Sequence, residues 1–71
     1  FMNLQELEVG VNVLLDTGDL AEVVAINDEA QTVLVCYLDA VAQPELVGAE
    51  VWLNPEEVIA IDMGTHSEGR T

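Results

Sequence analysis

The residues able to do chemistry are few and lie far apart along the chain. The only cysteine, Cys36, lies in an apolar run, and the only histidine, His66, directly precedes Ser67 near the carboxyl end. A nucleophile and its base need a rigid, oriented setting, whereas His66 and Ser67 lie in a stretch rich in Gly, Ser and Thr. A thiol among apolar neighbours is usually inert. We therefore assign no catalytic residue and expect a protein that is not an enzyme.

Acidic side chains occur in pairs, mostly where turns are expected. The pairs are Glu6 and Glu8, Asp16 and Asp19, Asp28 and Glu29, and Glu56 and Glu57. A calcium loop would space its acids as Asp-x-Asp-x-Asp-Gly, a pattern that the chain lacks. The paired acids of a glycosidase need a substrate cleft, for which 71 residues leave little room. We expect no metal and no cofactor, and we interpret the acids as a solvated surface that attracts basic partners.

The charge balance excludes several classes of partner. The chain has 14 Asp and Glu against one Lys or Arg, which gives a formal net charge of −13. It has almost no cation with which to bind phosphates or an anionic membrane surface. No stretch approaches the roughly 18 apolar residues of a spanning helix, and no basic-then-apolar leader is present. We expect no nucleic-acid partner and no membrane association. The lone cysteine favours a reducing cytosol, hence a cytoplasmic protein.

Turn signals divide the chain into short apolar runs typical of strands. Alternation with period two is clear in residues 9–15, and β-branched residues dominate 32–38. The expected strands are 9–15, 20–26, 32–38, 50–53 and 58–61. Before the last of them, Asn54, Pro55 and two acids predict a single turn of 3₁₀ helix. The sequence therefore predicts an all-β domain of five strands.

The ends of the chain are expected to lie outside this domain. Residues 1–6 form a lead-in, because residues 2–8 have helical propensity but make at most two turns. Phe1 precedes Met2, so we expect Phe1 to stand ahead of the natural initiator and set it aside. Residues 62–71 change to Gly, Ser, Thr and charge, which predicts a flexible tail.

The five short strands, with a one-turn helix between the last two, resemble the SH3-like small barrel. Val9-Gly10-x-x-Val13 before a Gly-containing turn resembles the opening of Tudor and KOW-type barrels. Residues 21–39 resemble their second and third strands, and 48–61 their fourth strand, helical turn and closing strand. The resemblance implies a five-stranded SH3-like barrel over residues 7–61, with a short 3₁₀ turn before the last strand.

Two aromatic residues lie within this barrel, and both are candidates for a partner site. Tudor domains that read methylated Lys or Arg surround the cation with several aromatic rings. Residues 7–61 offer only Tyr37 and Trp52. Trp52 points outward if Val51 and Leu53 belong to the core; the alternative places it beneath the loop of residues 39–48.

The run 32–38 is apolar on both of its faces. Val33, Val35 and Tyr37 share one face, and Leu34, Cys36 and Leu38 share the other. Only one face can be core, and the pattern leaves open which. The remaining face must contact the amino-terminal lead-in, a second subunit or a partner.

Two hypotheses about function follow from these patterns. In the first, the protein is a non-enzymatic interaction module that binds a basic segment of another protein, with Tyr37, Asp39 and Trp52 as the partner-binding residues. In the second, it is a homo-oligomeric structural protein whose subunit interface buries Leu34, Cys36 and Leu38.

Overall fold

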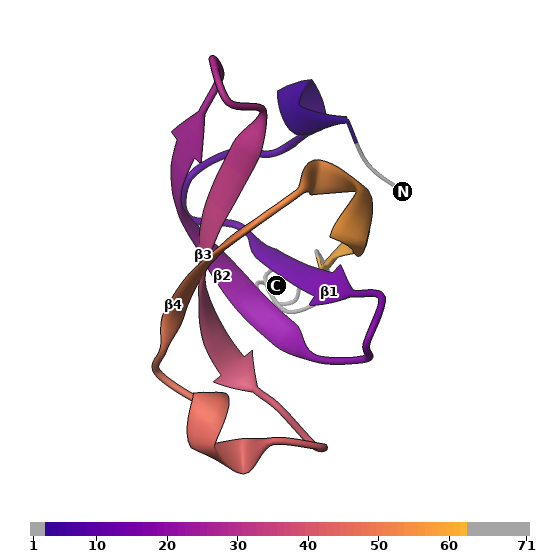
Figure 1. Cartoon of the computed structure of the whole chain (residues 1–71). Helices are drawn as coiled ribbons and strands as arrows, with labels where there is room; N and C mark the ends of the chain where they lie inside the picture. Colours follow the sequence, from indigo (N-terminus) through magenta and orange to yellow (C-terminus); the bar gives the residue numbers. More distant parts are fainter. Residues whose placement is uncertain (1–2, 63–71) are drawn as a thin grey trace, which may run out of the picture.

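Residues 3–62, which the computed structural model describes, form one antiparallel sheet of five strands (Figure 1). The strands are β1 (Asn12–Leu15), β2 (Leu20–Asn27), β3 (Thr32–Asp39), β4 (Glu50–Leu53) and β5 (Val58–Asp62). Three single turns of 3₁₀ helix accompany them in the described part: η1 (Leu4–Glu6), η2 (Pro44–Leu46) and η3 (Pro55–Glu57). The strand order across the sheet is β4-β3-β2-β1-β5. The all-β prediction and the 3₁₀ turn before the last strand are confirmed.

The turns are closed by short-range hydrogen bonds, some between backbone groups and some from a side chain to nearby backbone. In the turn between β1 and β2, Gly18 has a φ of +92° and its N–H donates to the Leu15 carbonyl at 2.9 Å. In the turn between β2 and β3, the Ala30 N–H donates to Asn27 Oδ1 at 3.1 Å. At η3, the Asn54 N–H donates to Glu57 Oε2 at 3.1 Å, which closes the turn that the Asn-Pro-Glu-Glu motif predicts.

The first strand is shorter than the alternating pattern indicates. We expect it over 9–15, but β1 begins at Asn12. Gly10 adopts a φ of +99° and the Val11 N–H donates to the Glu8 carbonyl at 3.3 Å, so the chain is still turning there. As a result Val9 is exposed instead of lying on the buried face.

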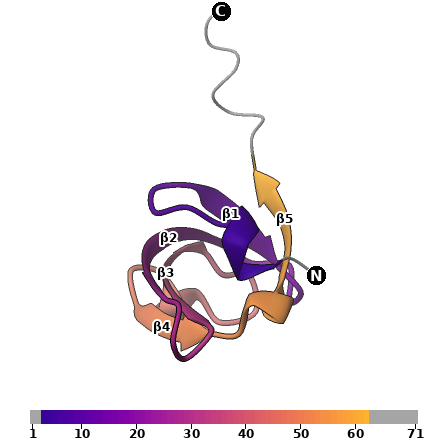
Figure 2. The same cartoon turned by 90° about the horizontal axis from the view of Figure 1, so that it is seen from above.

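The sheet is curled but open. β1 pairs with both β2 and β5, and register shifts occur at Leu14/Leu15 and at two places in β2. Such irregularities bend strands and increase their twist, which gives the curved sheet of Figure 2. Within residues 3–62, β4 and β5 do not pair with one another and are the two edges of the sheet. The described sheet is therefore not closed into a barrel.

One face of β3 is the core, which settles the question that the sequence leaves open. Val33 and Val35 are fully buried and Tyr37 is 8% exposed, whereas Leu34 and Cys36 are only half-buried. The same core contains the following buried apolar residues from the other segments: Leu4, Leu7, Val13, Leu15, Ala21, Val23, Ala40 and Val58.

The amino-terminal segment contributes to this core. Leu4 lies in η1 and Leu7 directly follows it, and both are buried in the hydrophobic cluster. Part of the expected lead-in 1–6 therefore packs with the sheet. At the other end, Asp62 belongs to β5, and the rest of the expected tail, with His66 and Ser67, lies outside the described residues. No helix in the described part is long and apolar enough to cross a membrane.

Candidate functional site

The outer face of the sheet carries the exposed tryptophan. Residues directly opposite each other in a ladder lie on the same face, and Leu34 is opposite Trp52 while Cys36 is opposite Glu50. Trp52 is 50% exposed, because Val51 and Leu53 on either side of it pack against the core. Trp52 therefore points outward, as expected if its two neighbours belong to the core.

A row of mostly polar residues crosses this outer face from one edge of the sheet to the other. The register places in line Glu50 of β4, Cys36 of β3, Glu22 of β2, Asn12 of β1 and Asp62 of β5. The carboxylates of Glu50 and Glu22 thus lie on either side of Cys36. The neighbouring row is apolar and contains Trp52, Leu34 and Ala25. We call Glu22, Leu34, Cys36, Leu38, Glu50 and Trp52 the outer patch.

The structure brings together only some of the residues that the sequence suggests for partner binding. Tyr37 points into the core, on the opposite face of the sheet from Trp52, so its ring is not available at the surface. Asp39 is exposed at the end of β3, opposite Leu20 in the ladder, and is five residues along the strand from Leu34, the residue opposite Trp52. We therefore leave Tyr37 and Asp39 out of the candidate site. Leu34, Cys36 and Leu38, which the sequence suggests as an oligomer interface, do share the face of Trp52.

The Tyr37 hydroxyl lies in an environment that disfavours its ionisation. Burial raises the pKa of Tyr37, and the carboxylates of Asp19, Glu57 and Asp16 raise this pKa further. Asp19 is itself buried and accepts a hydrogen bond from Thr17 Oγ1 at 2.9 Å. The phenol is therefore neutral at physiological pH, and Tyr37 acts as a core residue.

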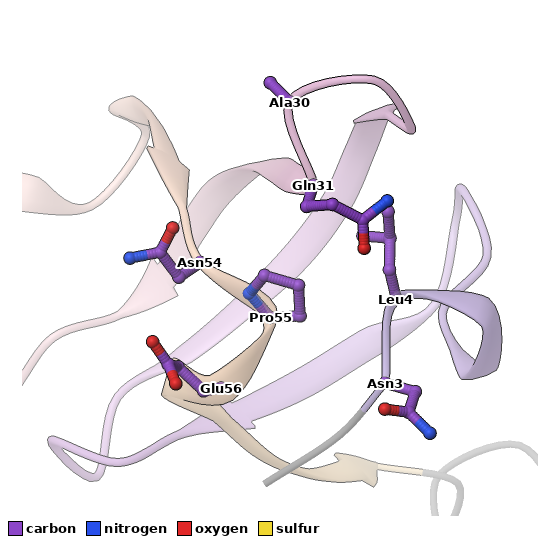
Figure 3. A pocket seen from close by; sticks show the side chains of 7 residues that line it. All are labelled: Asn3, Leu4, Ala30, Gln31, Asn54, Pro55 and Glu56. Carbon is purple, nitrogen blue, oxygen red and sulfur yellow. The ribbon is translucent and has the colours of Figure 1, made fainter.

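A separate hollow of about 310 Å³ opens at the end of β4 (Figure 3). It is lined by Asn3, Leu4, Ala30, Gln31, Asn54, Pro55 and Glu56, which come from η1, the β2–β3 turn and η3. Figure 3 shows Leu4 and Gln31 on one side of the hollow and Asn54 and Glu56 on the other. A second hollow of about 250 Å³ shares Asn3, Leu4 and Gln31 with it.

This hollow offers hydrogen bonds and no nucleophile. Its lining side chains are amides, one carboxylate and apolar groups, and Gln31 Nε2 already donates to the Asp28 carbonyl at 2.6 Å. Sequence reasoning missed the hollow, because the three segments that line it are far apart in the chain. Only the Asn-Pro-Glu-Glu turn gave a local signal there.

Neither metal geometry nor similarity to known proteins assigns a function. Within residues 3–62, no group of three or more His, Cys, Asp or Glu side chains is arranged to hold a metal ion. No family model, curated protein or solved structure matches the chain. Its function therefore has to be inferred from its own residues, and the outer patch is the surface that combines an exposed aromatic ring with charge.

Proposed function

We propose that this protein is a non-enzymatic interaction module that binds a basic segment of another protein on the outer patch. The observation that carries the proposal is Trp52, which is 50% exposed and lies on the same face as Glu50 and Glu22, the carboxylates on either side of Cys36. Tryptophan is the residue type most enriched among interface positions that dominate binding energy. Its ring face also attracts Lys and Arg side chains.

Apolar and acidic groups have different roles in this proposal. Leu34 provides apolar surface beside the tryptophan and Leu38 extends it along β3, and a bound segment would exclude water from this surface. The carboxylates of Glu22 and Glu50 pair with cations of the partner. The net charge of −13 attracts a basic partner over a longer distance and speeds its encounter, an effect that salt weakens.

As part of the same proposal, we interpret the open sheet as a variant of the SH3-like small barrel of the Tudor and KOW type. Its support is the number of strands, the pairing of the first strand with the last, and η3 directly before β5. We also place the protein in the cytoplasm, which the single cysteine supports. Fold alone names no function, so the binding proposal rests on the outer patch.

The test uses the single tryptophan as a reporter at the proposed site. A soluble peptide of Lys and Leu is titrated into the protein at low salt, with a Glu and Leu peptide of equal length as the control. We expect a saturable change in Trp52 fluorescence with the basic peptide only, and weaker binding in about 0.5 M NaCl.

A pair of matched variants locates the site by calorimetry. Trp52→Ala removes the anchor, and Ile59→Ala removes an apolar side chain of similar exposure, 47%, on the opposite edge strand β5. We expect Trp52→Ala to weaken peptide binding at least tenfold and Ile59→Ala to leave it unchanged. Equal affinity of the wild type and Trp52→Ala would remove the outer patch as the binding site.

A second candidate function uses the same surface differently. Leu34, Cys36 and Leu38 would form an isologous interface between two copies, so that the protein would be a homo-oligomer. One observation favours it. Leu34, Cys36 and Leu38 form an apolar row along the outer face of β3, and Leu38 at its end is 43% exposed. Repulsion between two chains that each carry −13 opposes it.

A further inference from the structure

The backbone of β4 presents hydrogen-bonding groups along one edge of the sheet that residues 3–62 form. In an antiparallel ladder, residues alternate between those whose N–H and C=O point to the partner strand and those whose groups point away. The Tyr37 N–H donates to the Ala49 carbonyl at 3.0 Å, which fixes the phase of this alternation between β3 and β4.

The alternation, followed along β4 from that bond, identifies the residues whose backbone N–H and C=O groups point away from β3. Val51 and Leu53 are opposite Val35 and Val33 and direct their backbone groups toward β3. Glu50 and Trp52 direct theirs away from the sheet. Within residues 3–62, β4 pairs with β3 alone, and no backbone hydrogen bond outside the strand ladders joins Glu50 or Trp52 to another segment. The edge therefore offers two N–H donors and two C=O acceptors.

We propose that the basic segment binds by adding a sixth strand to the sheet at β4. This inference rests on the proposed function and specifies how the segment is held. Strand addition to an exposed edge gives affinity through main-chain hydrogen bonds and specificity through alternate side chains. Here the residues with free backbone groups, Glu50 and Trp52, are also the ones whose side chains belong to the outer patch.

The register specifies the sequence pattern of the segment. Side chains directly opposite Glu50 and Trp52 in the new ladder lie on the outer face, about 5 Å from their partners. A Lys or Arg opposite Glu50 pairs with its carboxylate, and a Lys, an Arg or an apolar side chain opposite Trp52 packs on the indole. These two positions are separated by one residue, so the segment is extended, with a cation and a ring-packing residue at alternate positions.

Charge complementarity favours a basic segment over the other possible occupants of an edge. A second copy of this chain would bring a second net charge of −13 close to the first, together with another acidic edge strand. The other edge, β5, lacks an aromatic side chain. Natural proteins protect sheet edges by making the edge strands short or charged, and β4 is both. These features hinder pairing between two copies of β4. The negative charge still attracts a basic strand.

Amide hydrogen exchange measured by NMR tests the proposal residue by residue. In the free protein we expect the amides of Val51 and Leu53 to be protected and those of Glu50 and Trp52 to exchange rapidly. The probes are two peptides of equal Lys and Val composition, one with strict alternation and one with the same residues at helical spacing. The alternating peptide should bind more tightly and slow exchange of the Glu50 and Trp52 amides at least tenfold.

A backbone variant of the peptide provides the control and leaves the protein unchanged. N-methylation of the alternating peptide at the residues facing Glu50 and Trp52 removes the N–H donors that strand addition needs. We expect at least tenfold weaker binding, while N-methylation at the intervening residues has a smaller effect.

The possible failures separate the two proposals. Binding of either peptide to the outer patch without protection of these two amides would overturn strand addition and leave the proposed function intact. Absence of binding by both peptides would overturn both. Protection that appears with protein concentration and no peptide would assign the edge to a second copy, and so would also overturn the basic-segment proposal.

Discussion

At the scale of single residues, the two aromatic side chains of the described sheet have different surroundings because they lie on opposite faces. Trp52 is opposite Leu34, whereas Tyr37 shares its face with Val33 and Val35. The sequence identifies both as candidates for binding, since they are the two aromatic residues within the expected barrel. The choice between them depends on which face of β3 is core, and only the packing of the whole sheet decides it.

The burial of Tyr37 lowers the stability of the folded protein at alkaline pH. The unfolded chain ionises this phenol at its ordinary pKa of about 10, whereas the pKa of Tyr37 in the folded protein is raised. Between these two values the native state holds a proton that the unfolded state has lost, so the free energy of unfolding falls as pH rises. We expect this fall above about pH 10 in the wild type and not in Tyr37→Phe.

Urea denaturation between pH 8 and pH 11 measures the effect. Tyr37 is the only tyrosine and the chain contains no lysine, so few other groups titrate in this range. An equal alkaline loss of stability in Tyr37→Phe would show that the phenol is not its source.

Truncations on the two faces of β3 test the assignment of the core. Val35→Ala removes two methyl groups from a fully buried site and should cost about 2 kcal/mol of unfolding free energy. Leu38→Ala acts on a side chain that is 43% exposed and should cost less than about 1 kcal/mol. Thermal denaturation of both variants makes the comparison. A larger loss for Leu38→Ala would contradict the assigned face.

At the scale of elements, local patterns predict the strands well and their ends less well. Alternation and β-branched residues identify all five strands, and Asn54-Pro55 identifies η3. The start of β1 is missed because Gly10 takes a positive φ within an alternating run. The packing of Leu4 and Leu7 is also missed, since a short lead-in carries no periodic signal.

The site is predicted less completely than the strands that hold it. The outward direction of Trp52 follows from its two apolar neighbours. The row that joins Glu50, Cys36 and Glu22 depends on the register between three strands, which the sequence does not specify. The hollow beside η3 depends on three segments distant in sequence.

A charged substitution on the exposed face of β3 tests whether the outer patch binds a partner or a second copy of the chain. Leu34→Glu places a charge on the outer patch, and if that face were a subunit interface the assembly would dissociate. We expect instead a monomer before and after the substitution. Light scattering on a sizing column, at low and high salt, measures the mass. A wild-type oligomer that Leu34→Glu disrupts would favour the second candidate function.

At the scale of the whole molecule, the acidic charge and the open sheet act together. A surface with a large excess of carboxylates limits self-association, which a sheet whose described part ends in two edge strands would otherwise favour. In our proposal, the same surface attracts basic segments to the edge where Trp52 lies. Composition predicts the sign of the partner's charge. It does not predict that β4 and β5 stay apart, because closure depends on the twist and bulges of the strands between them.

The most direct test of the central claim is chemical-shift mapping by NMR with the alternating Lys and Val peptide at low salt. We predict saturable shifts confined to β3 and β4, largest at Trp52, Leu34 and Glu50, that diminish in 0.5 M NaCl. Shifts centred on the hollow of Asn3, Gln31 and Glu56, or no saturable shifts at all, would contradict binding of a basic segment to the outer patch.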